Sequence, residues 1–587
     1  MVRQFYQSGV HSTDLMNKTR KSIPDSQPVS PKGTIPGFLH SACARLPRGV
    51  RENLVPAGIF LLCFILYNTY TSLRMSGDTF PAGYLPFSIV YYHDLFLEHF
   101  ANPNFAANAY AFANINGHLV SLFPIVTPVF ITPFVFLCTW GMPAGQAILH
   151  VAQIGRTASA GIAALAACTF YLVIIRFVPK KIAILSTLIF AFATSTWSIS
   201  SQALWQHGTI ELFLLLMIYA ILRNEEKPSS LWFVILGILS GLFVFCRPPD
   251  ALLLLPILGY VVLLNRRYLA HYVFPGIIAG LPFLAYNEYY FGSIIGGYAQ
   301  NIPLFDFSAN FFPTFTGLLF SPNKGLFVFS PVLLLAFFGY FHIKSIDNKT
   351  ISRLFLWFGP VLILETVLYG FFGDTGGGYS YGPRFLTSLV PVLCIYAAFF
   401  LSDTATRFRA GLHDYVKVAV IAVLIVFSVV VQFIGVFYFP YLDDSHYPQP
   451  WEGSRLLIVS SFQDGTANLD TFVIQSIPPL PPWYYYSEND EWKSLNIQKT
   501  LAAGDYQTAA WYYENDIQEN PDSYILWNNL GACQIKLGEY EDALSSFNQS
   551  LEINPQFEEA GENQAVALQA IQQENTSAVT NTTVPAA

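Results

Sequence analysis

The sequence predicts an all-α protein, in which a polytopic membrane bundle of about 11–13 spans precedes a small module of helical hairpins. Two observations support this prediction. Hydrophobic residues make up 53% of the 587 residues and charged residues only 12%, whereas soluble domains carry about 25% charged residues. Toward the C-terminus the composition becomes polar, and similar segments recur 34 residues apart.

The composition and motif content exclude several classes of protein. The net charge of −8 is small for 587 residues and does not suggest a nucleic-acid partner. The sequence has no Walker loop, dinucleotide fingerprint, zinc-ligand spacing or Gly-x-Ser-x-Gly elbow. A soluble nucleotide therefore has no visible site, and this favours a substrate delivered in the lipid phase. The cysteines form no disulfide framework.

Residues 1–50 are polar and include the basic residues Lys18, Arg20 and Lys21. A secretory signal would place an apolar stretch much earlier in the chain. We interpret residues 1–50 as a cytoplasmic tail ahead of an uncleaved first span.

The membrane region is expected over residues 51–440. A spanning helix needs about 17–25 mostly apolar residues. The candidate spans lie near 54–73, 149–177, 181–197, 208–222, 231–246, 250–264, 272–290, 325–342, 353–371, 384–401 and 416–438.

Residues 119–140 are apolar but contain Pro124, Pro128 and Pro133. Each proline removes a helix hydrogen bond, and lipid offers no replacement. If this stretch does not fully cross, five basic loops share the cytoplasmic side with the N-terminus, as short cytoplasmic loops usually do. They are "RFVPKK", "RNEEK", "NRR", "HIKSIDNKTISR" and "RFRAGLHDYVK". This topology places the C-terminus outside.

The first outer loop, residues 74–118, begins with "SGDTFPAGYLPFSIVYYHDLFLEHF" near the first span. Asp78 lies between Gly77 and Pro81, where the backbone is constrained. An acid here is either a solvated loop charge or a general base that faces a membrane-embedded substrate. Asp94 and Glu98 are four residues apart and fit a solvated face or a cation site better than the base.

Other outer segments carry charged side chains beside glycine or proline. In "FFGDTGGGYSYGPRFL", Arg384 is either an anchor at the membrane surface or a clamp for a phosphate. Lys324 in "SPNKG" occupies a similar place, and His207 in "LWQHG" is a polar interfacial candidate. Arg247 and Asp250 in "CRPPD" are expected to pair with each other or to bind substrate.

The C-terminal part divides into a connector (441–489), helical repeats (490–573) and a disordered tail (574–587). "GDYQTAAWYY" and "GEYEDALSSF" lie 34 residues apart. Trp527, Leu530, Gly531 and Pro555 match the tetratricopeptide pattern. About two hairpins are few for an isolated solenoid, so these repeats are expected to contact a protein partner or the membrane region.

"SGDTFPAGYLPF", "NGHLVSLFPIVTPVF", "ATSTWSISSQALWQHG" and "GGGYSYGPRFL" occur in this order over roughly residues 50–440. In this order they resemble the GT-C class of membrane glycosyltransferases, and more narrowly its family 39 and RgtA/B/C/D-like branch. The resemblance implies transfer of a sugar from a polyprenyl-phosphate carrier to an envelope or protein acceptor at the outer face of the cell membrane. It also implies an external C-terminus, and C-terminal tetratricopeptide repeats are similar to an arrangement in several members.

The resemblance assigns roles to residues of this chain. Asp78 matches the acid of the first outer loop, which acts as base or orients the acceptor. Many relatives have two adjacent acids there, but Thr79 follows Asp78, so a divalent cation is an open question and no other cofactor is implied. Arg384 and Lys324 are candidates to bind the donor phosphate. Candidates to bind substrate are Tyr84, His118, His207, Arg247, Asp250 and Tyr381.

Two alternatives to a glycosyltransferase stay open. The repeats alone support a non-catalytic membrane scaffold that recruits partners. A transporter of lipid-linked sugars would show polar residues within its spans near the midplane, and the candidate spans show few.

Overall fold

The computed structural model describes residues 48–69, 78–100, 111–148, 150–299, 311–372, 377–378, 380–439, 450–453, 456–464, 501, 506–519 and 521–581. Residues 1–55 and 56–587 form two compact units. Of the first unit, only the beginning of the first labelled helix is described.

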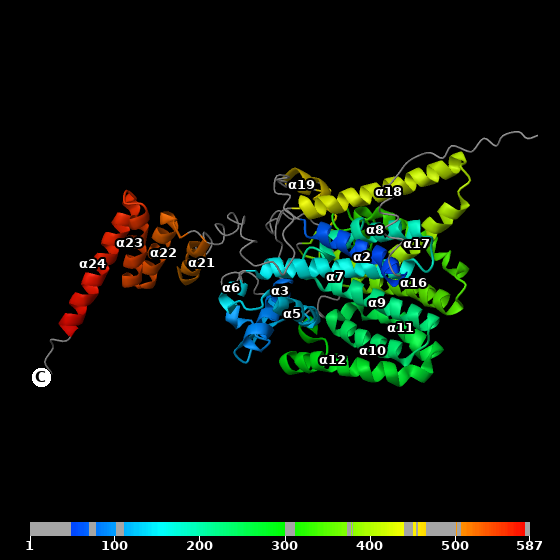
Figure 1. The fold of residues 1–587 in the computed structure, drawn as a ribbon, viewed down its shortest axis with the longest axis horizontal. Coiled ribbons are helices and arrows are strands. Elements are labelled where there is room, and N and C mark those ends of the chain that lie inside the picture. The colour runs from blue at the N-terminus through cyan, green and yellow to red at the C-terminus, as the bar shows by residue number, and fades with distance from the viewer. Residues whose placement is uncertain are drawn as a thin grey trace, which may run out of the picture. The chain divides into compact units, whose positions relative to one another are not determined.

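The described part of the membrane region is helical (Figure 1). Six of its helices are long and apolar enough to cross a membrane. They are, or include, α7 (Val151–Ile174), α9 (Gln206–Glu226), α12 (Leu269–Phe291), α16 (Lys349–Gly370), α17 (Val390–Arg407) and α18 (Leu412–Phe437). The all-α, polytopic prediction is therefore confirmed.

Shorter helices complete the membrane region. They are α2 (Arg48–Tyr67), α3 (Phe80–Phe87), α5 (Val126–Cys138), α6 (Ala144–Ile148), α8 (Lys180–Phe192), α10 (Ser230–Cys246), α11 (Leu255–Gly259), α13 (Phe311–Phe320), α14 (Leu326–Phe329), α15 (Leu335–Tyr340) and α19 (Leu457–Asp464). The expected span 325–342 is broken at Ser330–Pro331 into α14, a short 3₁₀ segment and α15. Proline causes this break because it removes a backbone donor.

The proline-rich stretch 119–140 holds the 13-residue helix α5. At 1.5 Å per residue this helix is about 20 Å long, which is shorter than the hydrocarbon core of about 30 Å. α5 alone therefore does not make a straight full span.

Glycines allow close helix packing between α10 and α12, which lie side by side (Figure 1). A Cβ atom on Gly237 would lie 2.1 Å from the carbonyl oxygen of Tyr272, and one on Gly241 would lie 2.2 Å from that of Gly276. Small residues at such interfaces let backbones approach, which is how membrane helices gain van der Waals contact without a hydrophobic driving force.

The basic loops gather at one end of the helices. Arg176, after α7, forms an ion pair with Glu226 at the end of α9, with 2.6 Å between Nε and Oε1. The side chain of Asn348, before α16, donates to Glu225 at 3.1 Å. A cavity of about 440 Å³ at this end is lined by Arg176, His342 and Asp403, among others. These contacts are consistent with the expectation that the basic loops share one side.

The first loop carries α3 and a two-stranded antiparallel hairpin, β1 (Phe112–Ile115) and β2 (His118–Ser121). Phe112 pairs with Ser121 and Ile115 with His118. Asn116 and Gly117 form the two-residue turn with φ values of 55° and 87°. Asn-Gly is favoured there because both turn positions need positive φ.

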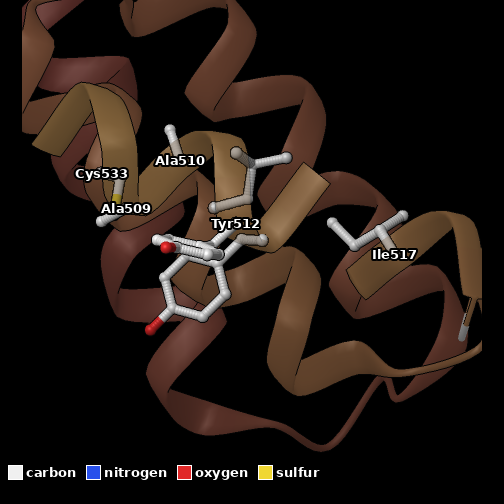
Figure 2. Close-up of a cluster of buried hydrophobic side chains, with 7 residues drawn as sticks. Ala509, Ala510, Tyr512, Ile517 and Cys533 are labelled. Atoms are coloured by element: carbon white, nitrogen blue, oxygen red, sulfur yellow. The ribbon is translucent and has the colours of Figure 1, made fainter. Parts of the chain in front are cut away.

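The C-terminal module consists of α21 (Tyr506–Glu519), α22 (Tyr524–Leu537), α23 (Tyr540–Ile553) and α24 (Glu558–Asn581). Its core between α21 and α22 includes Ala509, Tyr512, Ile517 and Cys533 (Figure 2). A Cβ atom on Gly531 would lie 2.6 Å from the ring of Phe547, so the repeat's glycine admits this ring between α22 and α23. α24 continues past residue 573, at which the repeats were expected to end.

Candidate active site

Asp78 and Arg384 form an ion pair at the helix ends opposite the basic loops. Nη1 of Arg384 lies 2.5 Å from Oδ2 of Asp78, and the side chains are 12% and 22% exposed. Asp78 precedes α3, and Arg384 begins a 3₁₀ segment that leads into α17. Sequence analysis assigned Asp78 as the candidate base and Arg384 as a candidate to bind the donor phosphate, both on outer segments. In the structure the two side chains contact each other directly.

An aromatic ring supports the guanidinium group of Arg384. Its Cζ atom lies 4.5 Å from the ring centroid of Trp205, the residue just before α9. Cation–π contact of this kind is favourable and fixes the plane of the guanidinium group. On another side, a Cβ atom on Gly377 would lie 3.5 Å from Nε of Arg384. Gly377 has φ of +59°, a conformation that glycine adopts readily.

Lys324 is almost fully buried, and its ammonium group bonds to the Gly-rich loop. Nζ donates to the carbonyl oxygens of Gly378 at 3.0 Å and Ser380 at 2.6 Å. A third contact, at 3.4 Å, goes to the hydroxyl group of Ser380. Since an ammonium group has three donors, these contacts favour a role for Lys324 in holding the loop over a role in binding phosphate.

Arg247 and Asp250 pair as expected, with 3.4 Å between Nε and Oδ2, and both are buried. Further donors reach the carboxylate of Asp250. The hydroxyl of Tyr369 donates to Oδ1 at 2.7 Å, and the hydroxyl of Ser388 donates to Oδ2. His207 is buried beside them, with Nδ1 3.5 Å from both Nε of Arg247 and Oγ of Ser388.

Tyr298 carries a phenol group in the neighbourhood of both ion pairs. Its hydroxyl donates to Oε1 of Gln206 at 2.9 Å. Burial raises the pKa of Tyr298 to about 12. Four nearby charges act on the same pKa: Arg247 and Arg384 lower it, whereas Asp78 and Asp250 raise it. Both ion pairs therefore lie within electrostatic range of this phenol. We define the candidate site as six residues, which are Asp78, His207, Arg247, Asp250, Tyr298 and Arg384.

Two tyrosines among the sequence candidates, Tyr84 and Tyr381, make contacts outside this group of residues. Tyr84 packs between the rings of Phe80 and Phe100, at centroid distances of 4.6 and 5.4 Å. Tyr381 donates its hydroxyl to the carbonyl oxygen of Val431 at 2.9 Å and is buried. These contacts favour structural roles for both tyrosines.

His118 lies on β2 and pairs with Glu98, with 2.7 Å between Nδ1 and Oε1. Burial would raise the pKa of Glu98, but hydrogen bonds from His118 and backbone N–H groups outweigh it and lower the pKa. Asp94 likewise pairs with His99 at 2.7 Å. Among the described residues these contacts stay within the first loop, so both acids belong to its local structure.

Sequence analysis missed two buried acids. Glu365 on α16 is fully buried, and the charged groups acting on it are Asp250 and Arg247. Glu211 on α9 is also fully buried and accepts a hydrogen bond from Thr196 at 2.9 Å. A lone acid within an apolar helix is the signal that would have found both residues, because such a charge is costly in a membrane.

The arrangement offers a half-buried carboxylate, two guanidinium groups and aromatic rings at one end of the helices. A carboxylate can take a proton from a hydroxyl group, and guanidinium groups can stabilise a developing phosphate charge. Among the described residues, no group of three or more His, Cys, Asp or Glu side chains could hold a metal ion. We assign no metal ligands.

Comparison with known families identifies two segments of the chain. Residues 135–287 match the dolichyl-phosphate-mannose-protein mannosyltransferase family. Residues 524–557 match the tetratricopeptide repeat. The chain has no significant match among curated proteins.

Both matches confirm the resemblance found in the sequence: the chain combines a GT-C-like membrane region with a C-terminal tetratricopeptide repeat. The mannosyltransferase-like segment contains Trp205, His207, Arg247 and Asp250. Asp78 and Arg384 lie outside it, before and after.

Proposed function

We propose that this protein is a GT-C-type glycosyltransferase. It transfers a sugar from a polyprenyl-phosphate donor to a hydroxyl group of an envelope or protein acceptor. The contact between Asp78 and Arg384 carries the proposal, because it brings a base and a phosphate-binding cation to one place. The mannosyltransferase-like segment supports the class of donor. The tetratricopeptide module would recruit the acceptor or another protein.

The proposed reaction begins with an exchange of ion-pair partners. The donor phosphate replaces Asp78 on Arg384, which frees the carboxylate. Asp78 then accepts the proton of the acceptor hydroxyl while the acceptor oxygen bonds to the anomeric carbon. The bond from that carbon to the phosphate oxygen breaks, and its electron pair leaves with the polyprenyl phosphate. Arg384 stabilises the added negative charge on this leaving group.

The proposed site faces outside the cell membrane, with the N-terminus in the cytoplasm and the C-terminus outside. The basic loops gather at the opposite end of the helices, where Arg176 and Asn348 contact Glu226 and Glu225. Cytoplasmic loops carry the excess of Lys and Arg, so this grouping supports the orientation.

Lys324 has a positioning role in this proposal. Its bonds to Gly378 and Ser380 hold the loop that precedes Arg384. Asn323, its neighbour, accepts from the backbone N–H of Leu457 at 2.7 Å and donates to the carbonyl oxygen of Glu452 at 3.0 Å. Part of the connector therefore packs beside the loop and supports it.

The test uses the full chain in proteoliposomes with polyprenyl-phosphate mannose and an envelope extract as the source of acceptors. A glycosyltransferase will release polyprenyl phosphate and place labelled mannose on an acceptor. Other polyprenyl-phosphate hexoses extend the same assay. A scaffold will leave every donor intact, and a transporter will move the lipid-linked sugar across the bilayer without cleaving it. Either of these last results would replace the proposal.

A further inference from the structure

Glu365 lies fully buried on α16, one turn before Tyr369. Within the described residues, no donor group reaches either oxygen of its carboxyl group, and the side chain in hydrogen-bonding range is the carboxyl group of Asp250. The neighbouring charged groups are Asp250 and Arg247. A buried carboxylate without a donor is very unfavourable, because an unpaired ion loses its hydration without compensation.

Asp250, in contrast, is surrounded by donors. It accepts from the hydroxyl groups of Tyr369 and Ser388, and Nε of Arg247 lies 3.4 Å away. These contacts suit an ionised carboxylate. If Glu365 were ionised too, two negative charges would lie side by side and neither could donate a hydrogen bond. One proton on Glu365 supplies the missing donor and removes the repulsion.

We propose that Glu365 is a neutral carboxylic acid that shares its proton with Asp250 and so positions Arg247 as a second cation for the donor phosphate. The inference rests on the proposed glycosyltransferase function. Glu365 is a positioning residue in this scheme, because it acts through Asp250 and Arg247 and does not touch the donor.

The contacts of Arg247 fit this role. Its polar contacts use Nε, toward His207 and Asp250, and its guanidinium group lies 5.3 Å from the ring centroid of Tyr369. Among the described residues, no hydrogen-bond partner is found for its two terminal nitrogens. Ser388, four residues after Arg384, donates to Asp250, the partner of Arg247, so the segment that carries Arg384 lies beside the Arg247–Asp250 pair. The terminal nitrogens are therefore available to a phosphate held by Arg384.

A neutral Glu365 also suits the balance of charge in this group of residues. Arg247 and Arg384 carry two positive charges, and Asp78 and Asp250 carry two negative charges. An ionised Glu365 would make this group of residues negative, which would oppose a phosphate in a region of low dielectric constant. With Glu365 neutral, these four charges sum to zero. The site then does not repel the donor phosphate that replaces Asp78 on Arg384.

The test compares Glu365→Gln, Glu365→Ala and Thr366→Val in the full chain in proteoliposomes. Gln is neutral and keeps a donor, so Glu365→Gln will keep the KM for polyprenyl-phosphate sugar within about threefold of wild type. Glu365→Ala leaves Asp250 without that donor, an effect of about 1–3 kcal/mol. We expect its donor KM to rise about 5–100-fold with less change in acceptor KM. Thr366→Val removes a hydroxyl from the same buried part of α16 and will leave both KM values unchanged.

Infrared spectroscopy detects the protonated carboxyl group of Glu365 directly. Wild-type protein at pH 7 will show the carbonyl stretch of a protonated carboxylic acid, and Glu365→Gln will lose part of that band. A Glu365→Gln variant as defective as Glu365→Ala, or an unchanged band, would overturn the inference.

Binding of polyprenyl phosphate without sugar separates this inference from the proposed function. If wild type and Glu365→Gln bind this lipid, Glu365→Ala does not, and no variant transfers sugar, the inference holds while the function fails. If transfer occurs but Glu365→Ala binds the lipid as wild type does, the function stands and the inference is wrong.

Discussion

Arg384 and Asp78 are 306 positions apart in the chain, yet Nη1 of the first lies 2.5 Å from Oδ2 of the second. The pair joins the segment before α3 to the segment before α17. Each residue neutralises the charge of the other. In the proposed reaction a donor phosphate replaces Asp78 on Arg384, which would couple donor binding to release of the proposed base.

Arg384→Lys tests the geometry of the phosphate contact. Lysine keeps the positive charge but loses the planar fork that can bind a phosphate through two nitrogens. One lost hydrogen bond to a charged group corresponds to about 1.5–3 kcal/mol, so the KM for the donor will rise about 10–100-fold. Steady-state kinetics with donor and acceptor varied separately will measure this. Equal changes in both KM values would count against a phosphate contact.

Lys324→Gln tests whether this residue holds the Gly-rich loop. The substitution weakens the bonds to Gly378 and Ser380, so the melting temperature and kcat will both fall. The donor KM will change less than in Arg384→Lys. Lys344→Gln, at an exposed position on a basic loop, is the control and will behave as wild type. A selective rise in donor KM in Lys324→Gln would instead favour the phosphate role expected from the sequence.

The orientation can be tested with single cysteines and an impermeant thiol reagent on intact cells. The described native cysteines are buried or half-buried, so background labelling will be low. His118→Cys, on the first loop, will react, whereas Lys227→Cys and Ser345→Cys, on basic loops, will be protected. Reaction at 227 and 345 with protection at 118 would invert the topology.

Gly531→Val tests the packing of the repeat module. Because a Cβ atom would lie 2.6 Å from the ring of Phe547, the substitution overpacks the core, at a cost of about 1–3 kcal/mol. Thermal scans combined with limited proteolysis of the full chain will show earlier cleavage within residues 506–581. Gly561→Ala is the matched control, since no neighbouring atom lies within 4 Å of its added Cβ. Unchanged cleavage in Gly531→Val would contradict this prediction, because α22 and α23 would then accommodate the valine side chain without loss of stability.

The fold class follows from the sequence because apolar length and the 34-residue spacing depend on local residues. The continuity of individual helices is harder to predict from the sequence than the fold class. The stretch 250–264 was expected as one span and is one continuous helical segment, but its geometry changes from 3₁₀ to α in α11 (Leu255–Gly259) and to π over Tyr260–Leu264. Prolines at 248, 249 and 256 remove donors at the beginning of these turns. An average of hydropathy over a span does not detect such changes in helix geometry.

The site was predictable only as a set of residues on one face. The charge of Arg384 and its position are visible in the sequence, but its pairing with Asp78 depends on how distant helices pack. The sequence also cannot show that backbone carbonyl oxygens satisfy Lys324. Glu365 was visible as a lone acid in "LILETVLYG", yet its role requires knowing that α16 faces Asp250.

The most direct test of the account is the rate of sugar transfer by Asp78→Asn in proteoliposomes, compared with wild type at equal amounts of folded protein. Asparagine keeps the shape and hydrogen bonding of the side chain but removes its basicity. General base catalysis contributes about 10²–10⁴-fold, so the account predicts that transfer will fall by about this factor while polyprenyl phosphate still binds Arg384. Asp94→Asn, which changes an acid that pairs with His99 within the first loop, will have a milder effect. Transfer by Asp78→Asn at the wild-type rate would contradict the account, because Asp78 would then be a loop charge and not the base.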